Sequence, residues 1–259
     1  MNEKILSPRF SGIERLYGSE GYERIQQAHI MVIGVGGVGS WAAEALARSQ
    51  VAHISLVDLD DICASNTNRQ VHTLTETIGQ PKTFAMSQRM HSINPDGRVT
   101  VIDDFLTPEN VTDIVTTDID FVIDAIDSIK PKVALIAHCF QHNIPLISVG
   151  GAGGQKDPTQ IQVSDLAKTH NDPLLAKLRY ELRRHHGFPK DPHKKMRVNC
   201  VYSSEQLWYP WPDGSVKHQK PGNGQSINCD TGFGTSSMVT ASFGLVAAAQ
   251  ALEAITKKN

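Results

Sequence analysis

The sequence predicts an α/β fold, a doubly wound and mostly parallel Rossmann-like sheet with a C-terminal extension. Short apolar runs that suit buried strands alternate with helical patterns from about residue 28 to residue 150. A glycine-rich turn joins the first apolar run to the helical pattern after it, and a second strand follows within about thirty residues. The length of 259 residues suits one large α/β domain or two small ones.

The individual elements follow in order along the chain. Residues 10–28 predict an amphipathic helical region that is broken at Gly18 and Gly21. The expected strands cover 28–34, 53–58, 99–102, 121–124 and 145–149, and the expected helices cover 41–49, 81–93, 108–115 and 130–143. Strands that alternate with helices in this way favour parallel pairing, because each helix carries the chain back to the same end of the sheet.

The alternation ends near residue 150, which leaves a distinct C-terminal part, residues 151–259, after a nucleotide-binding core at about 28–150. In this part we expect a strand at 160–163 and an extended segment at 207–211. The apolar stretch 232–255 is long enough to span a bilayer. Its small residues and polar insertions favour a buried core helix instead.

Charge is unevenly distributed. The net charge of −2 predicts no general attraction to nucleic acid, yet residues 177–197 carry a charge of +6 and the remainder about −8. The cations of this basic segment are Lys177, Arg179, Arg183, Arg184, Lys190, Lys194, Lys195 and Arg197. We expect a basic loop that is either a solvated surface or a contact for RNA phosphates.

The cysteines and the N-terminus indicate a location. None of the four cysteines lies in a C-x-x-C pair, so no zinc site is expected. Residues 1–9 lack the apolar core of a secretory signal. Four thiols without an export signal fit a reducing compartment, and we expect a cytoplasmic protein.

The glycine-rich turn predicts a nucleotide site. Gly34, Gly36, Gly37 and Gly39 stand between a strand and a helix, where backbone N–H groups can bind a phosphate. Asp58 ends the next strand, nineteen residues after Gly39, where an acid would accept hydrogen bonds from a ribose. These features alone fit a dehydrogenase equally well.

The segment after Asp58 separates the two interpretations. Asn66, Arg69 and Lys82 follow within twenty-four residues. A nicotinamide site does not need such a cluster, whereas a triphosphate needs cations to offset its charge. The sequence therefore favours a nucleoside triphosphate.

Asp124 ends the strand expected at 121–124, and Asp127 follows in the loop after it. Ligands bind at the carboxyl ends of strands in open α/β sheets, so this loop belongs to the same site. Asp127 is the candidate ligand of Mg²⁺, which prefers one or two carboxylates together with phosphate oxygens and water. Asp124 is interpreted as a turn cap.

Together these residues resemble the superfamily of ubiquitin-activating and molybdopterin- or thiamin-synthesis adenylating enzymes. The shared pattern comprises Gly34, Gly36, Gly37, Gly39, Asp58, Asp60, Asn66, Arg69, Gln70, Lys82 and Asp127. The resemblance implies ATP and Mg²⁺ as cofactors, with Asp58 or Asp60 on the ribose. It places Asn66, Arg69 and Lys82 on the phosphates and Asp127 on the metal. It also implies a homodimer in which Arg9 reaches the partner's ATP.

The sequence lacks the C-x-x-C zinc pairs and carries four segments by which it resembles the tRNA threonylcarbamoyladenosine dehydratase branch of that superfamily. These segments are 124–128, 150–154, 157–163 and 232–234. The resemblance implies one adenylating domain over residues 1–259 that activates the carboxylate of threonylcarbamoyladenosine beside the anticodon. The carbamoyl group then closes a ring and AMP leaves. Residues 177–197 would contact tRNA phosphates, and Trp208, Tyr209 and Trp211 are candidates for stacking, with at least one of them buried.

Three alternatives stay open at this point. An enzyme that adenylates the C-terminus of a small ubiquitin-like sulfur-carrier protein would need a reactive thiol for sulfur transfer. The candidates are Cys200 and Cys229, and we interpret each as a structural thiol. A non-catalytic nucleotide-dependent scaffold would not need a magnesium carboxylate. A dehydrogenase would bind NAD.

Overall fold

The computed structural model describes residues 8–221 and 233–257. In the first part of the chain the elements are α1 (Ser11–Ile25), β1 (His29–Ile33), α2 (Gly39–Arg48), β2 (His53–Val57), α3 (Lys82–Ile93), β3 (Arg98–Ile102), α4 (Val111–Ile114), β4 (Phe121–Asp124), α5 (Ile129–His142) and β5 (Leu146–Val149). They are followed by β6 (Ile161–Asp165), α6 (Pro173–His185), β7 (Asn199–Ser203), β8 (Tyr209–Pro210), β9 (Val216–Lys217) and α7 (Ser237–Thr256).

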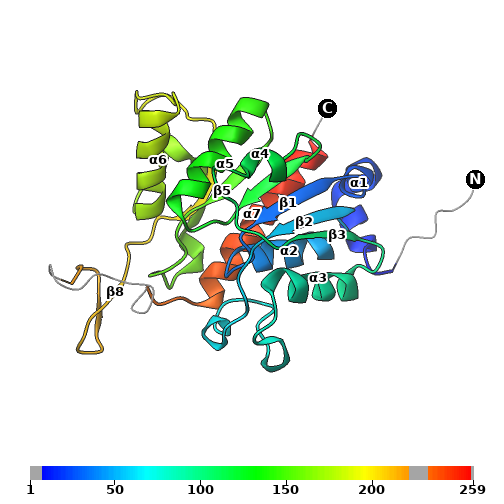
Figure 1. Cartoon of the computed structure of the whole chain (residues 1–259), viewed down its shortest axis with the longest axis horizontal. Coiled ribbons are helices and arrows are strands. Elements are labelled where there is room, and N and C mark those ends of the chain that lie inside the picture. Colours follow the sequence, from blue (N-terminus) through cyan, green and yellow to red (C-terminus); the bar gives the residue numbers. More distant parts are fainter. Residues whose placement is uncertain (1–7, 222–232, 258–259) are drawn as a thin grey trace, which may run out of the picture.

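Seven strands form one twisted sheet in the order β3-β2-β1-β4-β5-β7-β6 (Figure 1). All neighbours pair in parallel except β6, which runs antiparallel to β7 at the edge. The chain winds outward from β1 in one direction and from β4 in the other. The strand order therefore has a switch point between β1 and β4, which is where ligands bind in such sheets.

Alternation along β1 explains the two packed layers. Ile30 and Val32 pack into one buried cluster with residues of α2 and α7, while Met31 and Ile33 pack into a second cluster with residues of α5. Successive strand side chains point to opposite faces, so an entirely apolar strand must be covered on both sides. Figure 1 shows α2, α3 and α7 on one face of the sheet and α4, α5 and α6 on the other.

The predicted alternation of strands and helices between residues 28 and 150 is confirmed, with strand boundaries within about one residue. Helix α4 is shorter than the stretch 108–115 that the pattern predicted. Within α1 the backbone departs from helical geometry at Gly18, which has a φ of 72°. The second break, predicted at Gly21, is wrong, because this residue is helical and packs against Thr256 at the end of α7.

The C-terminal part is built into the same sheet. Strand β7 pairs with β5, and β6 pairs with β7, so the sheet continues across residue 150 without a boundary. The predicted loop over 177–197 is wrong for its first nine residues, because 177–185 belong to α6. Asp172 caps this helix by accepting the N–H of Leu175, and Pro173 occupies its first turn, which stabilises a helix start.

Helix α7 corresponds to the apolar stretch 232–255, of which residue 232 lies outside the described residues. Among those residues, α7 is the one helix that is long and apolar enough to qualify as a membrane span by length and composition. The core-helix prediction is confirmed for Ser237–Thr256, because α7 packs on α2 and its buried side chains join the main core. A Cβ at Gly244 would lie 2.4 Å from the carbonyl oxygen of Val38, so only glycine permits this close helix crossing.

Candidate active site

A cavity of about 980 Å³ opens at the carboxyl ends of the central strands, at the switch point between β1 and β4. Its walls come from the loops after β1, β2, β3, β4 and β5, with a contribution from the segment that leads into α7. Of the predicted site residues, ten line it, namely Gly34, Gly36, Gly37, Asp58, Asp60, Asn66, Arg69, Gln70, Lys82 and Asp127. Residues that lie up to ninety-three positions apart thus meet in one place.

The glycine turn between β1 and α2 forms one wall. A Cβ at Gly39 would lie 1.8 Å from the carbonyl oxygen of Gly34, so the turn is too tight for any side chain there. The N–H groups of Gly36 and Gly37 have no acceptor among the described residues, and no side chain caps α2. Unpaired N–H groups at the start of a helix attract an anion.

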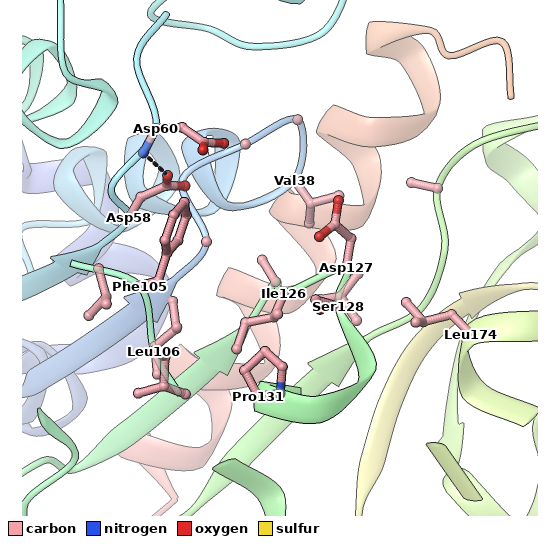
Figure 2. A pocket seen from close by; sticks show the side chains of 18 of the residues that line it. Val38, Asp58, Asp60, Phe105, Leu106, Ile126, Asp127, Ser128, Pro131 and Leu174 are labelled. Atoms are coloured by element: carbon pink, nitrogen blue, oxygen red, sulfur yellow. Dashed lines mark hydrogen bonds between the residues drawn. The ribbon is translucent and has the colours of Figure 1, made fainter. Parts of the chain in front are cut away.

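Asp58 fixes the glycine turn to the loop after β2. Its buried carboxylate accepts the N–H of Val35 at 2.6 Å and the N–H of Asp60 at 2.9 Å; Figure 2 shows the second bond. Burial raises the pKa of Asp58, while the positive charge of Lys82 and the two backbone donors oppose this shift. Each carboxylate oxygen can accept a second hydrogen bond, so Asp58 can still bind a ribose hydroxyl.

Lys82 and Asp60 are paired with each other, which the sequence did not indicate. The Nζ atom of Lys82 lies 2.6 Å from Oδ2 of Asp60, and the lysine is 93% buried whereas the aspartate is half exposed. The N–H of Lys82 also bonds to the carbonyl of Asp60 at 3.0 Å. An ammonium has three donors, so Lys82 can bind a phosphate while it keeps this partner.

Arg69 and Asn66 come from the short turn that crosses the glycine loop. The Nη1 atom of Arg69 donates to the carbonyl of Ser65 and to the side chain of Asn68, both at 3.0 Å, and its aliphatic part lies against Gly37. The side-chain oxygen of Asn66 accepts the N–H of Cys63 at 3.0 Å. These bonds orient both side chains and leave Nε and Nη2 of Arg69 and the Asn66 NH₂ group free to donate.

Asp127 differs from the other acids of the cavity. It is exposed on the loop after β4, and it makes no hydrogen bond or ion pair within the part of the chain that the structure describes. Figure 2 shows it across the cavity from Asp58 and Phe105. A free carboxylate beside anion-binding groups is a hard oxygen ligand that fits Mg²⁺, with the remaining positions left to phosphate oxygens and water.

A buried ion pair lies beneath this loop, and it was not predicted from the sequence. Asp124 and Lys132 are both fully buried, with Nζ 2.9 Å from Oδ2, and Ser148 donates a further bond to Asp124 at 2.7 Å. Lys132 also donates to the carbonyl of Ile126 at 2.9 Å, one residue before Asp127. Asp124 does accept the N–H of Ile126 at 3.2 Å, as a turn cap would. Its larger role is to hold the lysine that fixes the start of the Asp127 loop.

The cavity also has an apolar wall that was not predicted from the sequence. Phe105 and Leu106 line the cavity from the loop after β3, and the Phe105 side chain is half exposed there (Figure 2). A flat apolar wall in the same cavity as Asp58 suits a nucleobase. The rule that pointed to Asp127, ligands at the carboxyl ends of strands, would also have pointed to these residues because they follow β3.

Two predicted residues do not line this cavity. Gly39 lies behind the turn, where it allows the close approach to Gly34. Arg9 is exposed, and its Nη1 atom donates to the carbonyl of Ile93 at 3.1 Å. In this subunit Arg9 therefore plays no part in the chain's own cavity, and its reach to a partner stays a prediction.

The thiols in the described part of the chain are free, and two of them are unreactive. Cys200 is fully buried in β7, and burial raises its pKa far above the usual range. Burial likewise raises the pKa of Cys139 to about 12. Because the thiolate is the nucleophile, neither residue suits covalent catalysis, which confirms the structural interpretation of Cys200. Cys229 lies outside the described residues.

The basic segment is divided between fixed and free cations. Arg179 donates to the carbonyls of Leu166 and Thr169 at 2.8 and 3.1 Å, and Arg183 donates to the carbonyl of Pro189 at 2.9 Å. By contrast, Lys190, Lys194 and Lys195 are exposed. Among the candidate stacking residues, Tyr209 is buried, as was predicted for at least one of the three.

Comparisons with known proteins agree with this geometry. The ThiF family model matches residues 11–259. The tRNA threonylcarbamoyladenosine dehydratase of Escherichia coli is 51% identical over 252 residues, which cover 96% of this chain and 94% of the relative. The Haemophilus influenzae protein of the same name is 47% identical and covers 97% and 94%. A solved structure of the E. coli protein in complex with ATP has a TM-score of 0.85 at 50% identity, and covers 95% of this chain and 93% of that chain.

Proposed function

Because this chain belongs to the ThiF family, we propose that it catalyses the ATP-dependent dehydration of threonylcarbamoyladenosine in tRNA. The observation that carries the proposal is the meeting of Arg69, Lys82 and Asp127 around one cavity at the switch point. Two cations and one free acid beside open backbone N–H groups match a triphosphate rather than a dinucleotide. The E. coli relative has been solved with ATP, so ATP is the nucleotide that we assign.

The proposed reaction has two steps. A carboxylate oxygen of the modified adenosine attacks the α-phosphorus of ATP, the bond to the β-phosphate breaks, and pyrophosphate leaves. The carbamoyl group of the same modification then attacks the acyl carbon, AMP leaves with the former carboxylate oxygen, and one proton is released. The net change is the loss of one water from the nucleoside. Ring closure within one modification benefits from a high effective concentration.

The chain's own residues bind and orient ATP. The glycine turn, Arg69, Lys82 and Asn66 would hold the phosphates, while Asp58 and Asp60 lie where the ribose would bind. The positive groups are fixed before the reaction, so they would stabilise charge that develops on the departing pyrophosphate. When bound at Asp127, Mg²⁺ would neutralise phosphate charge.

The proposal also covers assembly and location. We take residues 1–259 as one adenylating domain, supported by the sheet that continues across residue 150. We place it in the cytoplasm, where tRNA is modified, as a homodimer in which Arg9 would contribute to the partner's ATP site. The exposure of Arg9 and its position away from its own cavity support this arrangement. The basic segment 177–197 would contact tRNA phosphates through its exposed lysines.

The alternative substrate, the C-terminus of a small sulfur carrier, gains no support from the two buried thiols. Cys200 is buried and Cys139 is too, so neither can accept sulfur from a carrier or partner protein. A sulfur-transfer partner would depend on Cys63 or Cys229 instead. Incubation with ATP and a carrier that ends in Gly-Gly would form an acyl-adenylate on the carrier only if the alternative holds.

The decisive experiment supplies purified protein with ATP and tRNA that carries threonylcarbamoyladenosine. We expect nucleoside mass spectrometry to show a product lighter by one water, with one AMP released for each nucleoside converted. An ATP analogue with a methylene group between the α- and β-phosphates should give no product, because adenylation breaks that linkage. Conversion with this analogue, or release of ADP in place of AMP, would overturn the adenylation step.

A further inference from the structure

A groove runs along the exposed side of α6. It lies outside the cavity at the switch point between β1 and β4, which we call the ATP cavity. It consists of two hollows of about 340 and 310 Å³ that share Ala176 and Arg179 in their walls. The hollow nearer the start of α6 is lined chiefly by His170, Asn171, Gln206, Leu207, Tyr209 and His218. The other is lined by Tyr180, Arg183, Arg184 and Lys190. We name the first the His218 hollow and the second the arginine hollow.

The His218 hollow adjoins the ATP cavity. Asp172 lines the hollow, and its Oδ2 atom accepts the N–H of Gly151 at 2.9 Å. Gly151 lines the ATP cavity, as does Leu174 two residues after Asp172 (Figure 2). The hydrogen bond between Asp172 and Gly151 thus joins the walls of the two spaces.

The His218 hollow presents an aromatic ring that is already held in place. The His218 ring lies against Trp208 in a tilted arrangement, with 3.7 Å between ring centroids and 37° between the ring planes. Trp208 is held in turn by Glu205, which accepts its indole N–H at 3.1 Å, and by the Lys156 ammonium 3.9 Å from its ring centre. A ring that is ordered before binding costs little further entropy when a ligand stacks on it.

The same hollow has hydrogen-bonding groups that make no hydrogen bond to the described residues. Nδ1 of His218 bonds to the carbonyl of Leu207 at 3.0 Å, which leaves Nε2 available. Asn171 uses its NH₂ group on Ser204 and keeps its side-chain oxygen, and Gln206 is exposed with no hydrogen bond to the described residues. An aromatic face together with neutral donors and acceptors is the chemistry that recognises a nucleobase edge.

The arginine hollow continues the groove with positive charge. Residues 176, 179, 180, 183 and 184 follow helical spacing and form one face of α6. Arg184 lies over the half-exposed Tyr180 ring, 5.6 Å from its centre, and Lys190 extends the charge beyond the helix. A cationic track next to a base-sized aromatic hollow matches single-stranded nucleic acid, whereas an acidic protein segment would not need the stacked rings.

We propose that the His218 hollow seats one nucleobase of the anticodon loop, a neighbour of the adenosine that reacts in the ATP cavity, while the arginine hollow follows the adjoining phosphates. This assignment rests on the proposed function for the identity of the RNA. It adds a subsite that would orient the substrate. Stacking on His218 would give affinity for any base, and the edge contacts of Gln206 and Asn171 would modulate it.

The test combines protein variants with altered RNA. Wild-type protein, His218→Ala, His218→Phe and the control His91→Ala are each titrated with anticodon stem-loops in which one loop base at a time is removed. His91 is exposed on α3, lies outside the basic segment 177–197 and lines neither hollow. We expect His218→Ala to lose about tenfold in affinity for the intact loop. His218→Phe, which keeps a ring, and His91→Ala should bind like the wild type.

One position of base removal should then weaken the wild type by a similar factor and leave His218→Ala unaffected, because the stacked pair is already lost. Equal losses for wild type and variant at every position would overturn the subsite, as would failure of the wild type to bind the loop. Binding is measured without turnover, so a protein that shows this pattern but forms no dehydrated nucleoside would keep the subsite and lose the proposed activity. Unchanged binding of an acidic peptide by His218→Ala is expected, and a loss there instead would favour a protein partner and overturn the RNA assignment.

Discussion

The ATP cavity and the lysine-rich end of the basic segment, residues 190–195, hold charged residues in opposite ways. Around the cavity, Asp58 is buried with two backbone donors, and Lys82 is buried against Asp60. In the basic segment, Lys190, Lys194 and Lys195 are exposed and make no ion pair with the described residues. Adenylation requires atoms held within a fraction of an ångström, which buried and bonded side chains provide. A polyanion requires only positive potential, which mobile surface lysines provide.

The same contrast predicts how each region responds to change. Substitutions near the cavity should alter stability or turnover, because each buried charge depends on a specific partner. Substitutions of the exposed lysines in the basic segment should alter affinity for RNA and its salt dependence, because these lysines have no fixed partner among the described residues. The following experiments test this distinction.

The largest effect is expected for the buried pair beneath the cavity. Lys132→Met leaves the Asp124 carboxylate buried without a cation, so the free energy of unfolding should fall by about 3–5 kcal/mol in urea titrations. Adding Asp124→Asn should restore most of that loss, because the charge is then removed as well. Lys130→Met, at an exposed position of the same helix, is the control. A loss below about 1 kcal/mol for Lys132→Met would show that the pair does not support the cavity.

The next effect concerns turnover. Asp127→Asn should lower ATP–pyrophosphate exchange by about 10²–10³-fold, because the charge that would hold Mg²⁺ is lost. The melting temperature should not change, since Asp127 is exposed and makes no hydrogen bond or ion pair with the described residues. Asp103→Asn is the control, an exposed acid after β3 that lies outside the cavity lining. Exchange at the wild-type rate would remove Asp127 from the site.

A pH dependence should follow from His72, which is buried near Lys82 and Arg89. Burial, with the charges of Lys82 and Arg89, lowers its pKa to about 4. Below about pH 6.5 His72 is protonated in the unfolded chain but stays neutral in the folded chain. The free energy of unfolding therefore has its full His72 contribution above pH 6.5 and decreases as the pH falls toward 4. The His72 contribution to that fall is on the order of 2–3 kcal/mol. Urea midpoints between pH 7.5 and 4.5 should decline less steeply for His72→Leu, and an identical decline would contradict the assignment.

The smallest effect is expected in the basic segment. Replacing Arg184, Lys194 and Lys195 with Glu should weaken tRNA binding by about tenfold at low salt and reduce the salt slope of the affinity. The KM for ATP should stay the same, and Arg15→Glu on α1 serves as a distant control. Arg183 is left intact because its bond to Pro189 holds the end of α6. Unchanged affinity in filter-binding titrations would show that the basic segment does not meet tRNA.

Local sequence patterns were sufficient for the central strands and for most of the ATP cavity. The apolar run 29–33, the glycine turn and Asp58 each follow rules that involve neighbours within a few residues. Phe105 and Leu106 follow β3 and so obey the rule that ligands bind at the carboxyl ends of strands. They were overlooked because neither is a charged or glycine residue of the kind that marks a nucleotide site. Strand β7 was also missed, because its short sequence becomes a strand only through pairing with β5 and β6.

The sequence by itself determined the alternation of strands and helices, the nucleotide turn and the set of charged residues near it, because these follow from periodicity and local backbone demands. Only the tertiary structure decided which charges are partners. The pairs Lys82–Asp60 and Lys132–Asp124 and the contact of Asp172 with Gly151 depend on where side chains from separate elements meet. Such meetings depend on packing over long sequence distances, which no local pattern encodes.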